Sequence, residues 1–164
     1  MISIKRIFLI ICVLIMAHAN AMHEILNQKS AAGNTALHLA LLHEDDWTAV
    51  QCSLALVEPL PYACDWTIKN DANQTNGDLL AIKLTKNLFE SETQKNQDLI
   101  KQKFVRLKEI HDLCGMIDNS FGFIKDETKL AELKSALRGY NRSELTEFYQ
   151  AMASDNKGES SDGQ

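Results

Sequence analysis

The sequence contains few of the residues that interrupt helices. Among its 164 residues there are seven glycines and only two prolines, Pro59 and Pro61, which lie almost side by side. Because glycine and proline mark most turns, their scarcity predicts helices joined by few loops. No segment has the pattern of a convincing β-strand. We therefore expect an all-α fold.

Clusters of basic residues are also missing. The chain has 17 lysines and arginines against 22 acidic residues, a net charge of −5. Proteins that bind nucleic acids or anionic membrane surfaces usually present a basic patch to phosphate groups. The composition therefore argues against both kinds of partner. The sequence also lacks the common catalytic and metal-binding motifs of hydrolases, P-loop proteins and EF-hands, so it predicts no catalytic residue and no cofactor.

The first residues have the organisation of a secretory signal peptide. Lys5 and Arg6 precede an uninterrupted apolar run over residues 7–17, and small residues at Ala17 and Ala19 form a cleavage site. A retained membrane anchor is the alternative, but such an anchor needs about 20 apolar residues. We expect a signal peptide over residues 1–19, with Ala21 as a second cleavage position. The protein is then exported, to a bacterial periplasm or beyond the cell.

Three cysteines remain once Cys12 leaves with the signal peptide. Export favours disulfide bonds, and Cys52 with Cys64 is the pair closest in sequence. Cys114 is then either a free thiol or an intermolecular one. The alternative is three unpaired cysteines buried as small apolar residues.

Apolar periodicity and capping residues divide the remaining chain into helices. The expected helices cover residues 22–28, 35–43, 47–57, 79–89, 91–114, 127–138 and 141–152. The expected caps are Thr35, Asp46, Asp78, Ser91, Asp126 and Asn141, with Gly115 as a C-terminal stop. Trp47 falls on the apolar face of its helix and is expected in the core. Residues 154–164 form a polar tail, which we expect to be disordered.

One motif is more specific than these patterns. Residues 33–40 read Gly-Asn-Thr-Ala-Leu-His-Leu-Ala, which resembles the core of an ankyrin repeat. Glycine permits a tight turn, threonine caps the helix and bonds to the histidine, and a small alanine lets paired helices approach. Both leucines are expected to face apolar neighbours. The matched positions are Gly33, Thr35, Leu37, His38 and Ala40.

A second repeat is much fainter. Placing Asn76 on the position of Gly33 and Asp78 on that of Thr35 gives a spacing of 43 residues, against the usual 33. The excess is expected as an insertion near Pro59. The resemblance covers residues 20–89, and the helices over residues 90–153 are expected to cap the short repeat stack.

The resemblance implies a protein-binding module, an adaptor or effector without chemistry of its own. Family members bind through the finger tips and the inner helices. On this sequence, the corresponding residues are Ala31, Ala32, Asn34, Leu42, His43, Gln74 and Thr75. Two alternatives stay open: a self-associating structural protein of the cell envelope, and a metal-binding protein that uses His111 and Cys114.

Overall fold

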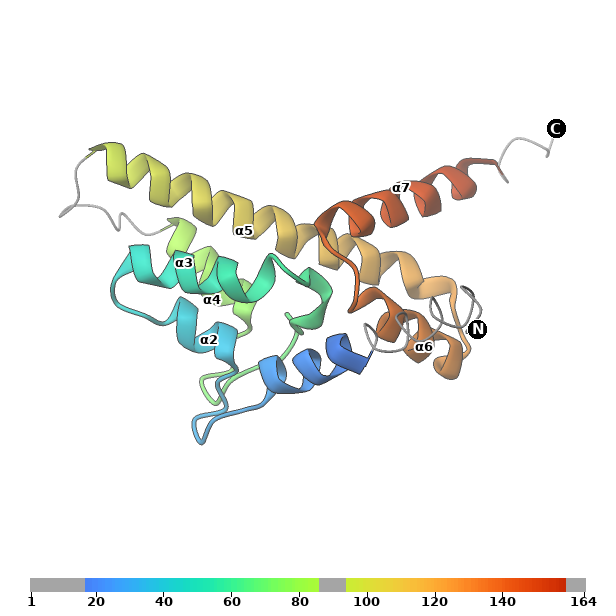
Figure 1. Ribbon diagram of the computed structural model, residues 1–164, viewed down its shortest axis with the longest axis horizontal. Coiled ribbons are helices and arrows are strands. Elements are labelled where there is room, and N and C mark those ends of the chain that lie inside the picture. The colour runs from blue at the N-terminus through green and yellow to red at the C-terminus, as the bar shows by residue number, and fades with distance from the viewer. Residues whose placement is uncertain (1–16, 86–93, 159–164) are drawn as a thin grey trace, which may run out of the picture.

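The computed structural model describes residues 17–85 and 94–158 (Figure 1). Within these ranges all regular structure is helical, apart from one isolated bridge between Lys69 and Thr75. After a helix over residues 17–27, the elements are α2 (Ala36–Leu41), α3 (Asp46–Val57), the short 3₁₀ helix η1 (Pro61–Ala63), α4 (Asn76–Thr85), α5 (Gln94–Ser120), the 3₁₀ helix η2 (Phe121–Phe123), α6 (Glu127–Leu137) and α7 (Arg142–Gly158). The expected all-α fold is confirmed. None of these helices is long and apolar enough to cross a membrane.

Local hydrogen bonds explain where several helices begin. Thr35 caps α2 with the reciprocal bonds of a capping box. Asp126 accepts hydrogen bonds from two backbone N–H groups at the start of α6. Asn141 and Glu144 exchange bonds before α7. These three caps are as expected, whereas α3 is capped by Asp45 and not by Asp46.

Four helices form a two-layer core. The hairpin of α2 and α3 packs against the pair of α4 and α5: α2 lies beside α4, and α3 lies beside α5 (Figure 1). The contacts are apolar and fully buried, with Leu37 and Leu41 from α2, Val50 and Val57 from α3, and Phe104 from α5 among them. This packing gives α2 and α4 a shared outer face.

Three expectations about helix ends and burial are wrong. Helix α5 does not stop at Gly115 but runs to Ser120, because Ile117 continues its buried face; Phe121, at the start of η2, is buried as well. Trp47 is 40% exposed instead of lying in the core, and the Nζ atom of Lys103 lies 5.7 Å from its ring centre. Helix α7 runs to Gly158, so the first part of the expected disordered tail is helical.

The helix over residues 17–27 contacts both the η1 segment and the end of α6. The amide of Asn27 donates to the carbonyl oxygen of Ala63 at 2.8 Å. Near the start of this helix, the side-chain oxygen of Asn20 accepts hydrogen bonds from Ser135 of α6 and from Arg138 directly after it, each at 3.1 Å. Only residues 17–19 of the expected signal peptide, and no part of residues 86–93 with the expected Ser91 cap, lie among the described residues.

Candidate functional site

The turn before α2 is built around the predicted motif. Gly33 has a φ of +70°, and an added Cβ there would collide with Asp71. The hydroxyl of Thr35 lies 2.7 Å from Nδ1 of His38, and both side chains are buried. Nε2 of His38 lies 3.0 Å from the carbonyl oxygen of Gln74. Since a carbonyl only accepts, Nε2 carries the hydrogen and Nδ1 accepts from Thr35.

The turn before α4 repeats this arrangement 40 residues later. Asn73 has a φ of +60°, matching Gly33. The N–H of Thr75 donates to Asp78 at 2.8 Å, and the N–H of Asp78 donates back to the hydroxyl of Thr75 at 3.1 Å. Thr75 therefore occupies the position of Thr35, and the expected alignment of Asp78 with Thr35 was three residues too late.

These two turns, which we call fingers 1 and 2 (residues 28–35 and 68–75), lie side by side below the helices in Figure 1. The amide of Asn70 donates to the side-chain oxygen of Asn34 at 3.0 Å. The backbone N–H of Asp71 donates to the carbonyl oxygen of Ala32 at 3.3 Å. Together with the bond between His38 and Gln74, these contacts fix one finger against the other.

Three large aliphatic side chains are exposed on the inner helices α2 and α4 and at the end of α2. Leu39 is 54% exposed, and Leu42 and Ile82 are each 45% exposed. The spacing of 40 residues gives Ile82 the same position in the second hairpin that Leu42 has in the first. The next equivalent pair, His43 and Lys83, is in direct contact. Nζ of Lys83 donates to the carbonyl oxygen of His43 at 2.9 Å. We call Leu39, Leu42 and Ile82 the inner-helix face.

Some of the predicted binding residues are exposed, whereas others are already engaged in hydrogen bonds within the protein. Ala31, Ala32, Leu42 and His43 are exposed. The side chain of Asn34 and the carbonyl group of Gln74 instead hold the fingers together, and the hydroxyl of Thr75 bonds to Asp78 at the start of α4. Leu39 was expected to face apolar neighbours, but it points outward; only Leu37 is buried.

A polar cavity of about 120 Å³ lies on another side of the molecule, between the helix over residues 17–27, the segment after η1, α5 and α6. The hydroxyl of Tyr62 donates to Asp118 at 2.6 Å, and Lys134 lies 2.9 Å from the same oxygen atom. Burial raises the pKa of Tyr62 far above its ordinary value, and the hydrogen bond to Asp118 raises it further. The lining comes from His23, Tyr62, Cys64, Asp65, Trp66, Thr67, Cys114, Asp118, Lys134 and Arg138. These residues come from four separate segments, and no local sequence pattern identifies them as a group.

The expected disulfide between Cys52 and Cys64 is absent. Cys52 lies on the exposed face of α3, whereas Cys64 is buried with its sulfur 4.0 Å from the carbonyl oxygen of Leu56. Cys64 and Cys114 instead line the same cavity. Burial raises the pKa of each buried thiol to about 12, with Asp65 adding to the effect at Cys64 and Asp118 adding to it at Cys114.

His111 and Cys114 do not converge on a metal position. Nδ1 of His111 lies 3.1 Å from Asp112, and its ring stands edge-on to Trp66 with 4.9 Å between ring centres. The sulfur of Cys114 lies 3.6 Å from the carbonyl oxygen of Pro61. Residues 17–85 and 94–158 contain no group of three or more side chains placed to hold a metal ion. Comparisons with protein families, with curated proteins and with solved structures find no match for this chain.

Proposed function

We propose that this protein is an exported, ankyrin-type binding module that holds a protein partner against its fingers and inner-helix face. The observation that carries the proposal is the exposure of Leu39, Leu42 and Ile82 on neighbouring inner helices, next to two fixed fingers. When a partner covers large aliphatic side chains, the free energy falls by about 25 cal/mol for each Å² of apolar surface removed from water.

Two features support the ankyrin-type interpretation, and one departs from it. The turn–helix–helix unit occurs twice with the same cap position and the same positive φ, and His38 bonds to the neighbouring finger. The spacing of 40 residues exceeds the usual 33. The segment containing η1 lies in the extra length and holds the helix over residues 17–27 through Ala63 and Asp65.

The fixed fingers favour binding without rearrangement. Because the finger side chains are already bonded to one another, little conformational entropy is lost when a partner docks. The partner surface that complements this face is apolar at its centre. The tip of finger 1 at Ala31 and Ala32 is uncharged and does not oppose such contacts, whereas the tip of finger 2 carries the exposed Asp71.

Site-specific photo-crosslinking in the native cell tests the proposal. A crosslinking residue at Leu42 should capture one partner, whereas the same residue at Cys52, exposed on α3, should not. The double change Leu39→Asp and Ile82→Asp should weaken capture at least tenfold, because buried hot-spot contacts typically contribute 2 kcal/mol or more. Val105→Asp, at a 43% exposed position on α5, is the matched control.

Two results would contradict the proposal. The first is equal capture from Leu42 and Cys52. The second is undiminished capture by the doubly charged variant, provided that circular dichroism shows it to be folded. Export is tested separately by sequencing the amino terminus of the protein recovered outside the cytoplasm, where Asn20 is the expected first residue.

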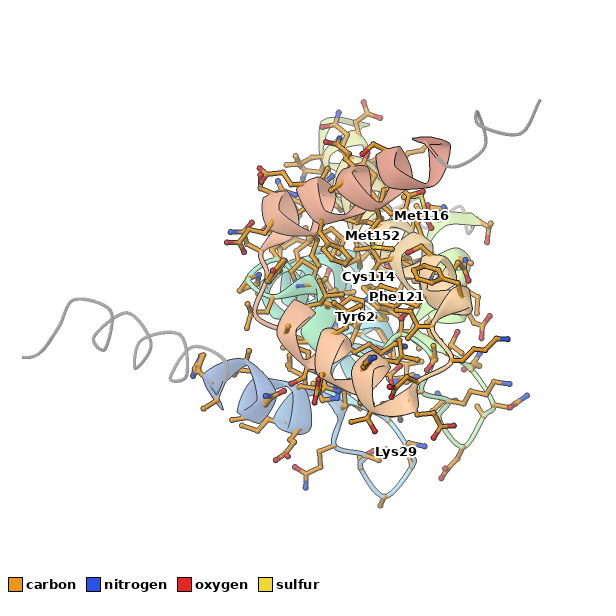
Figure 2. The ribbon with its side chains drawn as sticks, turned by 90° about the vertical axis from the view of Figure 1, so that its right-hand side faces the viewer. Lys29, Tyr62, Cys114, Met116, Phe121 and Met152 are labelled. Atoms are coloured by element: carbon orange, nitrogen blue, oxygen red, sulfur yellow. The ribbon has the colours of Figure 1, made fainter. Side chains whose placement is uncertain are left out.

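A self-associating structural protein is the second candidate. Phe123 in η2 is 66% exposed and Met116 in α5 is 43% exposed. Figure 2 shows Met116 and Met152 on the side of the molecule where α5 meets α7. Light scattering separates the candidates: a dimer that Phe123→Ser dissociates supports self-association, whereas a monomer with and without reductant removes it.

A further inference from the structure

The two buried thiols lie on elements that meet at one carbonyl group. Cys114 is on α5, and its sulfur lies 3.6 Å from the carbonyl oxygen of Pro61. Pro61 begins η1, the tight turn that leads directly to Cys64. A 3₁₀ turn advances about 2 Å per residue, so Cys64 follows Pro61 by roughly 6 Å. In Figure 2 Tyr62, within this turn, and Cys114 lie close to one another near the centre of the view.

The surroundings leave room for the thiols to approach. Both line the same cavity, which has a volume of about 120 Å³ and offers space into which either side chain can rotate. A disulfide bond needs Cα atoms about 4.4–6.8 Å apart. The turn also contacts α5 through the hydrogen bond from Tyr62 to Asp118, and both thiols line one cavity, so we expect the bond to need only a local movement of the turn.

We infer that Cys64 and Cys114 form a disulfide bond when the chain folds in an oxidising compartment. The bond joins the segment after η1 to α5 and so closes one side of the cavity. The structure described above is the reduced form, in which both thiols are free. That the protein meets such a compartment rests on the proposed export, whereas the bond itself is a property of the chain.

The chemistry is thiol–disulfide exchange with a small or protein disulfide as the oxidant. One thiolate attacks a sulfur of the oxidant and releases the first oxidant thiolate, which leaves a mixed disulfide. The second thiolate attacks the protein sulfur of that mixed disulfide, forms the S–S bond and releases the second oxidant thiolate. The two thiol protons pass to the two leaving thiolates, so two thiols are oxidised and one disulfide is reduced.

Burial decides when this exchange takes place. Because the thiolate is the nucleophile, a buried thiol with a pKa of about 12 reacts slowly near neutral pH. Exchange is therefore fast while the chain is folding and slow once the fold has buried the two thiols.

Refolding with oxidised glutathione tests the inference without any need for export. The full chain with Cys12→Ser and Cys52→Ser is unfolded, then refolded with or without the oxidant. We expect a loss of two hydrogen masses, a linked peptide pair containing Cys64 and Cys114, and a rise in Tm of the order of 10 °C over the reduced form. Cys64→Ser and Cys114→Ser, made in the same background, should each prevent the linked pair.

The outcomes are distinguishable. Two alkylatable thiols after refolding, or only glutathione adducts or dimers between chains, overturn the inference. Either result leaves the binding proposal untouched, because Leu39, Leu42 and Ile82 lie on other elements. Conversely, failure of partner capture leaves the refolding result standing.

Discussion

Nε2 of His38 lies 3.0 Å from the carbonyl oxygen of Gln74, 36 residues further along the chain. Its other ring nitrogen accepts from Thr35, so one buried imidazole links the start of α2 to the neighbouring finger. The two hairpins are therefore joined by a polar contact as well as by apolar packing. The residues around this contact allow the first two of four tests of the fold.

His38→Ala should lower the free energy of unfolding by about 3 kcal/mol, because the buried hydroxyl of Thr35 and the carbonyl of Gln74 both lose a partner. Urea denaturation followed by circular dichroism measures the change. His43→Ala, at an exposed position near the end of the same helix, is the matched control and should change it by less than about 0.5 kcal/mol. Equal losses in the two variants would show that His38 does not link the hairpins.

Gly33→Ala should destabilise the protein by about 2 kcal/mol, since its φ of +70° is unfavourable for a residue with Cβ and the added atom meets Asp71. Asn73→Gly tests the equivalent position in finger 2. Glycine tolerates the φ of +60° there better than asparagine, so stability should stay within about 0.5 kcal/mol or rise. Thermal melting of the two variants separates these effects; a loss in both would refute the equivalence of the fingers.

Two glycines within helices should respond in opposite directions to alanine. Gly115→Ala in α5 places its Cβ in open space and should stabilise the protein by about 0.5–1 kcal/mol through helix propensity. Gly77→Ala in α4 brings Cβ to 2.8 Å from Nε2 of His111, whose ring packs against Trp66. The displacement of His111 should make this variant less stable than the parent. The measurement is the midpoint of chemical denaturation, and stabilisation by Gly77→Ala would contradict the close packing.

Stability of the reduced protein should fall as pH rises above about 9. The folded state holds the thiols of Cys64 and Cys114 protonated up to a pKa of about 12, whereas the unfolded chain releases these protons near pH 9. Because the unfolded state is then favoured, each thiol removes about 1 kcal/mol at pH 10. Urea titrations from pH 8 to pH 10 should show a shallower decline for Cys114→Ser, and Cys52→Ser controls for the removal of an exposed thiol. An unchanged slope in Cys114→Ser would refute the protonated, buried thiol.

Short-range signals predicted the first hairpin well. Thr35 and His38 lie three residues apart, and Asn141 with Glu144 shows the same spacing, so each cap is encoded within one turn of helix. The same signal was present in finger 2, where Thr75 and Asp78 form a threonine–acid pair. The predicted alignment missed this pair because it placed Asn76 on the position of Gly33 and so put Asp78, instead of Thr75, on the position of Thr35.

Features that depend on distant residues were not predictable in the same way. Gly115 was expected to end a helix, but its backbone is not left-handed and Ile117 continues the buried face. The pairing of Cys52 with Cys64 followed from sequence distance alone, whereas the rotation of α3 turns Cys52 toward solvent. The cavity joins residues as far apart as His23 and Arg138, which only the packed helices bring together.

The bond from Asn20 to α6 has a consequence for the order of maturation. Ala19 is buried one residue before it, within a helix that runs without interruption over residues 17–27. A peptide bond inside a packed helix is out of reach of a protease until that helix opens. Under the proposed export, removal of a leader after Ala19 would have to precede docking of this helix. It would spare the contacts to Ser135 and Arg138, whereas removal after Ala21 would delete them. In the proposed maturation, the choice between the two cleavage positions would decide whether the protein keeps the contact between its amino-terminal helix and the end of α6.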